Sequence, residues 1–428
     1  MTEKMKPSGI TWIGDVPQDW ECKRFRFCGD VQYGYPFNSD YFSSEETGFP
    51  LIRIRDITSG EIATYYEGTY PDEYIVKSGD VLVGMDGDFN VRVWANCDAL
   101  LNQRCCRVLD SQQINKRFMA YYLPHYLKVI NDLTWSTTVK HLLADNINNI
   151  YVAYPQMCEQ QAIADFLDTQ CAKIDSVIAD IEKQIETLQK YKKSRITEAV
   201  TKGLDRSVPM MDSGIEWIGK IPAHWGTNRL RYVASVKTGP FGTQLSADEY
   251  VDEGVPIINV KNIGYGSILA EDLDFVPESV AGRLSVHRLK LDDIVFGRKG
   301  AVDKHAIITD KYVDWVQGSD CIRVRSNSEI DSGYLNYLFD STYFGSYVML
   351  YAVGATMPSM SSDILLNARI LVPPVHEQRD IATYLDDQCE KINAIIDNKQ
   401  AQLDVIRSHK KSLIYEYVTG KKRVTEVN

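Results

Sequence analysis

One phrase occurs twice in the chain. "SGITWIGDVPQDW" begins at Ser8, and "SGIEWIGKIPAHW" begins 205 residues later at Ser213. A second pair follows: "EQQAIADFLDTQCAKID" begins at Glu159, and "EQRDIATYLDDQCEKIN" begins 218 residues later at Glu377. Self-similarity at a fixed period indicates a fold built from repeated units. We therefore expect a pseudo-two-fold internal repeat, in which each half has a Trp-rich opening motif, a variable middle and a long charged segment.

The two charged segments are predicted to be long helices that pair with each other. In each, a stripe of residues recurs at steps of 4, 3, 4 and 3, which is a heptad pattern. The stripes are Ile174, Ile178, Ile181, Ile185 and Leu188 in the first segment, and Ile392, Ile396, Lys399, Leu403 and Ile406 in the second. A long helix with one apolar stripe needs a partner. Because a whole domain separates the two helices, the chain can return and lay them antiparallel; Lys399 should weaken the seam locally.

The variable middles are predicted to mix strands and helices. Short β-branched runs bounded by Gly, Asp or Pro indicate strands at "PLIRIRDI", "GDVLVG", "VPIINVKNI", "DDIVFG" and "DCIRVR". "KRFMAYYLPHYLKVIND" and "SGYLNYLFDSTYFGSYVM" indicate helices, whose aromatic faces we expect in the core rather than as platforms for stacked bases. The predicted fold class is α+β, with two similar mixed α/β domains joined by an antiparallel coiled coil. The predicted boundaries are 1–154 and 205–372 for the domains, 155–204 for the first helix, and 373–428 for the second helix with a C-terminal tail.

Composition limits the function classes. The net charge of −11 argues against a protein that binds nucleic acid through charge alone, and each variable middle carries more acidic than basic residues. No apolar run reaches the roughly 18 residues of a membrane span, and "MTEKMKPSGITW" has no apolar signal core, so we expect a cytoplasmic protein. None of the nine cysteines stands in a C-x-x-C pair, which indicates reduced thiols rather than a zinc site.

Motifs for catalysis are missing. The sequence has no P-loop, no G-x-G-x-x-G, no H-E-x-x-H, no G-x-S-x-G and no methyltransferase tetrapeptide of the [Asn/Asp]-Pro-Pro-aromatic type. "VTGKKR" near the C-terminus lacks the first glycine of a P-loop. We therefore nominate no catalytic residue and no metal ligand, which disfavours a self-contained methyltransferase or nuclease.

The order of these features resembles that of one family. Duplicated opening motifs, duplicated P-x-x-x-E-Q helix starts and two divergent middles are similar to the specificity subunit of a Type I restriction–modification enzyme, over nearly the whole chain. The resemblance implies two target-recognition domains, each reading one half of a split double-stranded DNA site in the major groove, and a coiled coil that fixes the spacer. It also implies a chain without catalysis of its own and without bound cofactors. Two modification (methyltransferase) subunits would use S-adenosylmethionine, and restriction subunits would use ATP and magnesium.

A two-headed coiled-coil adaptor that joins protein partners, without DNA specificity, is the alternative function. If the chain reads DNA, its acidic net charge must be explained. Either the basic side chains cluster on one face, or the partner subunits supply much of the phosphate contact, and we favour both together.

Candidate reading residues lie on loops, because base edges are read by polar side chains that enter a groove. The Gly-aromatic loop 32–41 has its counterpart in 237–246, and matching positions elsewhere carry different side chains, as two different half-sites would require. Any one candidate could instead be an ordinary exposed loop residue. The candidates in the first domain are Tyr33, Tyr35, Phe37, Asn38, Arg53, Arg55, Asp56, Asp86, Asp88 and Arg92, with Gln103 and Lys140 as weaker ones. Those in the second are Thr243, Gln244, Asn259, Lys261, Asn262, Arg298, Lys299 and Lys304.

The repeated tryptophans are expected to pack rather than to read. Large aromatic side chains at fixed places in both copies suit the docking of each domain onto the helix ends. A role in binding modification subunits is the alternative. The residues concerned are Trp12, Trp20, Trp217 and Trp225.

Overall fold

The computed structural model describes residues 4–133, 141–142, 144–215, 218–241, 244–300, 302–352 and 359–424. The chain forms two compact units, one from Met1–Ile181 with Ala401–Asn428 and one from Glu182–Gln400. Thr243, Trp217 and Lys140 lie outside the described residues. Within the described residues, no helix is both long and apolar enough to cross a bilayer.

The first unit combines two small sheets with a covering helix. The opening motif forms the antiparallel pair β1 (Met5–Pro7) and β2 (Asp15–Pro17), and β3 (Glu21–Arg24) pairs with β13 (Tyr151–Tyr154). One antiparallel sheet has the order β10 (Val91–Val93), β9 (Val81–Gly84), β12 (Cys105–Leu109) and β4 (Asp30–Tyr33). The other has the order β5 (Phe42–Ser43), β7 (Tyr65–Tyr66), β6 (Phe49–Ile52), β11 (Ala99–Leu101) and β8 (Ile75–Val76). The helices are η1 (Phe25–Phe27), η2 (Ser39–Tyr41), α1 (Ile54–Ser59), η3 (Asp72–Tyr74), α2 (Lys116–Leu133) and α3 (Ala144–Asn148).

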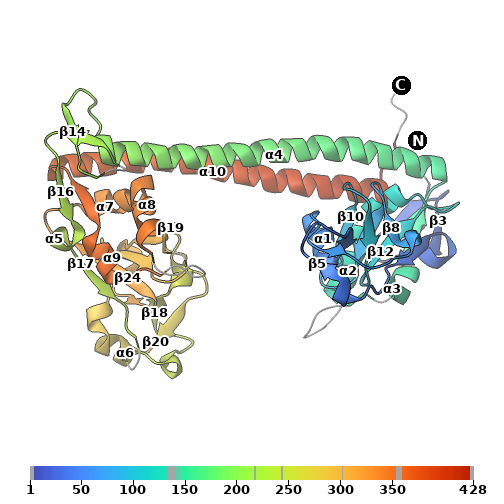
Figure 1. Cartoon of the computed structure of the whole chain (residues 1–428), viewed down its shortest axis with the longest axis horizontal. Coiled ribbons are helices and arrows are strands. Elements are labelled where there is room, and N and C mark those ends of the chain that lie inside the picture. The colour runs from blue at the N-terminus through green and yellow to red at the C-terminus, as the bar shows by residue number, and fades with distance from the viewer. Residues whose placement is uncertain are drawn as a thin grey trace. The chain divides into compact units, whose positions relative to one another are not determined.

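The second unit repeats this plan with a larger middle (Figure 1). The pairs are β14 (Met210–Asp212) with β15 (Lys220–Pro222), and β16 (Gly226–Arg229) with β25 (Arg369–Val372). The sheets are β17 (Ala234–Thr238), β24 (Cys321–Ser326), β21 (Ile294–Gly297), β22 (His305–Ile307) and β19 (Tyr265–Gly266), and then β20 (Asp274–Val276), β18 (Val255–Ile258) and β23 (Val316–Gln317). The helices are α5 (Leu230–Val233), η5 (Ala247–Glu249), η6 (Val260–Asn262), α6 (Glu278–Arg283), η7 (Ser285–His287), η8 (Asp310–Tyr312), α7 (Ser332–Asp340), α8 (Thr342–Tyr351) and α9 (Ser362–Asn367).

The predicted aromatic faces belong to the core. Phe118 and Tyr122 on α2 are fully buried, as are Tyr334 on α7 and, within 2 % exposure, Phe344 on α8. The second segment is two helices rather than one, because Ser341 ends α7 and its hydroxyl accepts the Phe344 N–H (3.3 Å) that starts α8.

The strand predictions at "PLIRIRDI" and "VPIINVKNI" are wrong in their second halves. Each strand ends after its first isoleucines and a helical turn follows, α1 or η6. The cause is a local cap: the Asp56 carboxylate accepts the Arg53 N–H (2.8 Å), and the Asn262 side chain accepts the Asn259 N–H (3.1 Å). Such a side-chain bond at a helix start satisfies a backbone donor that a strand would have used.

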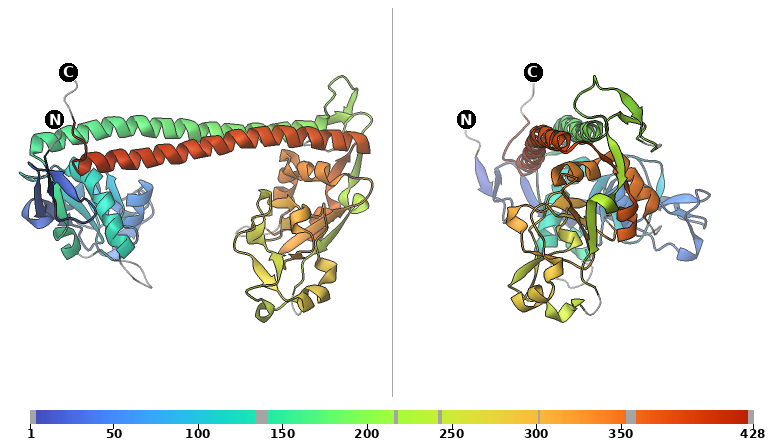
Figure 2. Two further views of the ribbon diagram at one scale, coloured as in Figure 1. Left: turned by 180° about the vertical axis from the view of Figure 1, so that it is seen from behind. Right: turned by 90° about the vertical axis from the view of Figure 1, so that its left-hand side faces the viewer.

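The long helices α4 (Met157–Lys202) and α10 (Val375–Val418) each contribute a segment to both units, and within each unit the two segments lie side by side (Figures 1 and 2). The predicted stripe is the less exposed face: Ile181, Ile392 and Leu403 are buried, whereas Val177 and Ile395, off the stripe, are each 47 % exposed. The α4–α10 pairing and the mixed α/β middles confirm the predicted fold class.

The duplicated E-Q pair anchors each helix start to its domain. The fully buried Gln160 side chain accepts the Asn115 N–H (2.9 Å) and donates to the Gln113 and Pro155 carbonyls (2.7 and 2.9 Å). Gln378 makes the same three bonds in the second unit, with the Asp331 N–H and with the Glu329 and Pro373 carbonyls. Buried amides with all partners in place fix the orientation of the chain.

The opening motif packs against the end of the other long helix. A Cβ on Gly420, just past α10, would lie 3.2 Å from the Trp20 ring, and one on Gly203, just past α4, would lie 3.2 Å from the Trp225 ring. Both tryptophans are buried, and Trp225 also donates to the Glu377 carboxylate at the start of α10 (2.9 Å). Each unit therefore holds the start of one long helix and the end of the other, which accounts for the repetition of the phrase and confirms the packing prediction for these two tryptophans.

Candidate nucleic-acid interface

A glycine lets one predicted loop pass close over a turn in each unit. A Cβ on Gly34 would lie 2.0 Å from the Asn102 carbonyl oxygen, and one on Gly239 would lie 1.8 Å from the Gly318 carbonyl oxygen. No side chain fits at such a distance, so glycine is required there. The Gly-aromatic loop and the turn form one surface in both units.

In each unit the tip of one hairpin, β9–β10 or β21–β22, is hydrogen-bonded to the turn that the glycine loop crosses. The Met85 N–H donates to the Arg104 carbonyl (2.9 Å), and the Arg298 N–H donates to the Asp320 carbonyl (2.8 Å). The two units therefore use the same backbone bonds here, although their side chains differ.

A fourth segment closes the arrangement. The Leu142 N–H donates to the Met85 carbonyl (2.7 Å), and the Met360 N–H donates to the Arg298 carbonyl (2.9 Å). We call these assemblies the loop clusters. The first comprises residues 34–37, 85–88, 102–104 and 141–142, and the second comprises 239–241, 298–300, 318–320 and 359–360.

The loop clusters carry opposite charges at equivalent positions. In the first, Asp86 lies 3.9 Å from Arg104, and His141 Nδ1 lies 2.7 Å from the Asp86 carboxylate. In the second, Lys299 takes the place of Asp86 and lies 3.3 Å from Asp320, which takes the place of Arg104. Lys299 and Asp320 are about half exposed, whereas Asp86 is only 19 % exposed beside the exposed Arg104 and His141. Ion pairs that solvent reaches contribute little to stability, so these groups can exchange their partner for a base edge or a phosphate. A carboxylate accepts from the cytosine amino group, whereas arginine and lysine bind the guanine edge.

Arg104 is a candidate that the sequence analysis missed. Its backbone has φ +68°, and its side chain is largely exposed. A bulky residue in the left-handed region is strained, and such strain is concentrated at functional sites. Nothing in the local sequence marks this residue; it stands out only once the turn is matched with that of Asp320.

Arg298 has a donor without a partner. Its Nε is buried and makes no hydrogen bond within the described residues. An unpaired buried donor is costly, so Nε does not account for the position of this side chain. Lys304, across the hairpin from Gly297, lies over the Tyr265 ring (5.5 Å to the centroid), and the Tyr265 hydroxyl donates to Asp303 (3.0 Å).

Four of the predicted reading residues have structural roles within the fold. Asp56 and Asn262 are buried caps, and burial raises the pKa of the Asp56 carboxyl. Arg92 binds the last carbonyls of α1, donating to Ile57 and to Thr58 (2.6 Å for the latter), and Phe37 is buried. These contacts explain the four side chains without DNA.

The remaining candidates differ in how accessible their side chains are. Arg53, Asn38, Asp88 and Gln244 are exposed, Arg55 donates to Thr64 (2.9 Å), Tyr33 lies on β4, and Tyr35 packs on Phe37 with centroids 5.0 Å apart. Gln103 lies in the turn of the first loop cluster. Lys261 donates to Asp272 and Asp274 (3.0 and 3.2 Å), which raises the pKa of its amine, and Asn259 also donates to Asp274 (2.7 Å). The charge of Lys261 is therefore already balanced.

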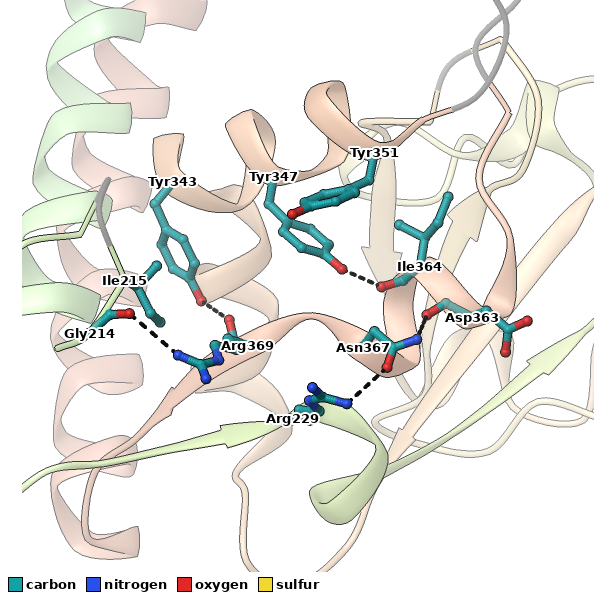
Figure 3. A pocket seen from close by; sticks show the side chains of 10 residues that line it. All are labelled: Gly214, Ile215, Arg229, Tyr343, Tyr347, Tyr351, Asp363, Ile364, Asn367 and Arg369. Atoms are coloured by element: carbon teal, nitrogen blue, oxygen red, sulfur yellow. Dashed lines mark hydrogen bonds between the residues drawn. The ribbon is translucent and has the colours of Figure 1, made fainter.

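A cavity of about 600 Å³ lies apart from the loop clusters, in the second unit (Figure 3). Tyr347 donates to the Ile364 carbonyl (2.8 Å), and Arg369 donates to the Gly214 carbonyl (3.4 Å) across it. Its walls therefore bind one another. Within the described residues, no cluster of three or more His, Cys, Asp or Glu could hold a metal ion.

Comparison with known proteins gives consistent matches over both units. The family model for the Type I restriction modification DNA specificity domain matches residues 17–187 and 222–405. The specificity subunit of the Type I restriction enzyme EcoBI from Escherichia coli is 27 % identical over 408 residues, covering 94 % of this chain and 85 % of that protein. The MjaVIII specificity subunit from Methanocaldococcus jannaschii is 28 % identical over 425 residues, covering 96 % and 95 %. A solved chain from the type I R-M system, 14 % identical, has a similar fold, with a TM-score of 0.64 over 95 % of this chain and 99 % of that one.

Proposed function

This chain belongs to the Type I restriction modification DNA specificity family, and from that membership we propose that its two loop clusters each read one half of a split DNA sequence. It is a specificity subunit of a Type I restriction–modification system.

The exchanged charges at matching positions carry the proposal. Two readers of different half-sites need the same frame with different side chains, and the loop clusters have the same backbone bonds with Asp86 and Arg104 replaced by Lys299 and Asp320. Arg298 adds a cationic side chain that the first cluster lacks, since Met85 occupies the equivalent place. We infer that these side chains contact base edges in the major groove.

The long helices are the proposed ruler. Because the Gln160 and Gln378 side chains fix each helix start to its domain, a change in helix length is transmitted to the position of that domain. We keep the predicted division into reading domains 1–154 and 205–372 and helices 155–204 and 373–428 as part of this proposal.

Catalysis and most of the phosphate binding are assigned to partner chains. Two modification subunits would methylate adenine with S-adenosylmethionine, and restriction subunits would use ATP and magnesium, while this chain selects the site without catalysing a step itself. The net charge of −11 supports a share of phosphate contacts for the partners, because DNA affinity depends on neutralised phosphates. The proposed compartment is the cytoplasm, where the host DNA lies.

The test is a single substitution in one loop cluster. Arg298→Ala is measured in the complex with the modification subunit. It should lower methylation of DNA that carries the complete site 10- to 100-fold, which corresponds to about 1–3 kcal/mol for a base contact. Discrimination among sequence variants of the half-site that the first unit reads should not change. Lys311→Ala, which removes an exposed cation on η8 outside the loop cluster, is the matched control and should have little effect. Equal loss of discrimination at both half-sites would refute the two-reader proposal.

A further inference from the structure

An exposed aromatic residue follows an arginine at the same place in both units. Arg26 and Phe27 belong to η1, and Arg231 and Tyr232, 205 residues later, belong to α5. Both rings are 63 % exposed. In the first unit the Arg26 guanidinium lies over the Phe27 ring, 4.8 Å from its centroid.

The framework around these residues is also repeated. Arg24 donates to the Asn149 side-chain oxygen (3.0 Å), and Arg229 donates to that of Asn367 (3.4 Å). We call the two surfaces the paired patches: Arg24, Arg26 and Phe27 in the first unit, and Arg229, Arg231 and Tyr232 in the second.

The fold gives no reason for the exposed rings. Trp20 and Trp225, which are repeated as well, are buried in the core instead. A ring left in water contributes no burial to that core. One exposed aromatic residue needs no explanation, but the same exposure at equivalent places in two otherwise divergent domains indicates a shared task.

The paired patches lie away from the loop clusters. In the first unit the patch lies before β4 and the Gly-aromatic loop lies after it, and in the second unit the same holds for β17. At 3.3 Å per residue, the strand places roughly 13–17 Å between the patch and the loop. The loop clusters differ in charge between the units, as two half-sites require, whereas both patches keep an exposed ring beside an arginine. The arginine contacts differ: Arg26 lies over the Phe27 ring, and Arg231 donates to the Asn367 side chain and to the Leu366 carbonyl (3.4 Å for the latter). A shared surface fits one ligand bound twice, and an aromatic ring is suited to a protein pocket more than to a row of phosphates.

We propose that the paired patches dock two copies of the same protein subunit, whose surface offers an apolar hollow rimmed by carboxylates. The proposal rests on the proposed function, in which two identical modification subunits join this chain, and it assigns the residues that hold them. Aromatic side chains and arginines are the residues that dominate binding at interface hot spots. Arg26, Arg229 and Arg231 are exposed cations on a chain with a net charge of −11, and they would be complementary to an acidic rim.

The experiment measures stoichiometry. The full chain is co-purified with its modification subunit without DNA, and the complex is weighed by native mass spectrometry. The unsubstituted chain should hold two subunits, Phe27→Ala or Tyr232→Ala should hold one at concentrations that saturate the unsubstituted chain, and the double variant should hold none. Each site should lose about 30-fold or more in affinity, as expected for a hot-spot aromatic residue.

Exchange variants provide the matched controls. Phe27→Tyr and Tyr232→Phe place each unit's residue in the other and should keep two subunits, as should Tyr41→Ala, which removes an exposed ring that has no aromatic counterpart. A folded double variant that still holds two subunits would overturn the inference and leave the proposed function standing. If these variants instead weakened DNA binding by the chain alone, the patches would be DNA contacts, which also overturns it. An unsubstituted chain that binds no modification subunit would contradict the proposed function itself.

Discussion

The buried glutamine at the start of each long helix allows a quantitative prediction. The Gln378 side chain accepts the Asp331 N–H (2.7 Å) and donates to the Glu329 and Pro373 carbonyls (3.1 and 2.7 Å). Gln378→Ala leaves these three buried backbone groups without a partner. At about 1 kcal/mol for each lost bond, the attachment of α10 to the start of α7 should weaken by about 3 kcal/mol.

Hydrogen exchange measures this loss locally. Amides of residues 329–339 should exchange roughly 100-fold faster in Gln378→Ala, since about 1.4 kcal/mol corresponds to a factor of ten. Gln160→Ala should produce the same change in the matching segment of the first unit, because the same three bonds are removed there.

A second glutamine on the same helix is the control. Gln388 is only partly buried, and its side chain donates to the neighbouring Asp387 (3.1 Å). Gln388→Ala should change the same exchange rates by no more than a few-fold. If Gln378→Ala and Gln388→Ala gave equal effects, the anchoring argument would be wrong.

Four further predictions follow from the geometry. The double substitution Asp86→Lys with Arg104→Asp, which gives the first loop cluster the charges of the second, should change the bases selected at one half-site and leave the other unchanged, as read by binding selection from random DNA. Gly239→Ala should displace its loop, because the new Cβ would lie 1.8 Å from the Gly318 carbonyl oxygen, and should lower DNA affinity by more than tenfold in a titration. Burial lowers the pKa of His287 to about 4, below the ordinary 6.5 expected when unfolded. The unfolded chain therefore takes up the proton first, and the second unit should lose about 2 kcal/mol of unfolding free energy between pH 8 and pH 5, a loss that His287→Asn should largely remove in denaturant titrations. Seven residues inserted into each of α4 and α10 add about 10 Å of helix and should lengthen the DNA spacer by about three base pairs; an unchanged spacer would refute the ruler.

The periodic and duplicated features could be predicted from the sequence. The heptad stripe from Ile174 to Leu188 predicts a helix and its less exposed face, and the repeat at Ser8 and Ser213 predicts two similar units. The heptad stripe is a local pattern, and the repeat is found by comparing one part of the chain with another, so neither depends on knowing the fold. The domain boundaries stay a prediction, because the compact units divide the long helices instead of ending at them.

The errors have a common cause, which is that side-chain roles depend on contacts distant in sequence or on unusual backbone. Asp56 and Asn262 were nominated as readers because their side chains differ between copies, yet both are buried caps, and a capping residue three positions after a strand end was the available signal. Arg104 was missed because only its left-handed backbone brings it beside Asp86. The duplicated E-Q pair marks Gln160 in the sequence, but its three partners are apparent only in the fold.

Base-resolution mapping of methylated adenines tests the central claim most directly. The host would express this chain with its modification subunit, and the same host without the chain would be the comparison. The account predicts methylation within one two-part sequence with a fixed gap, and its loss when the chain is absent. Methylation that is unchanged without the chain would mean that the chain does not choose the site, and would favour an adaptor that joins proteins through its coiled coil.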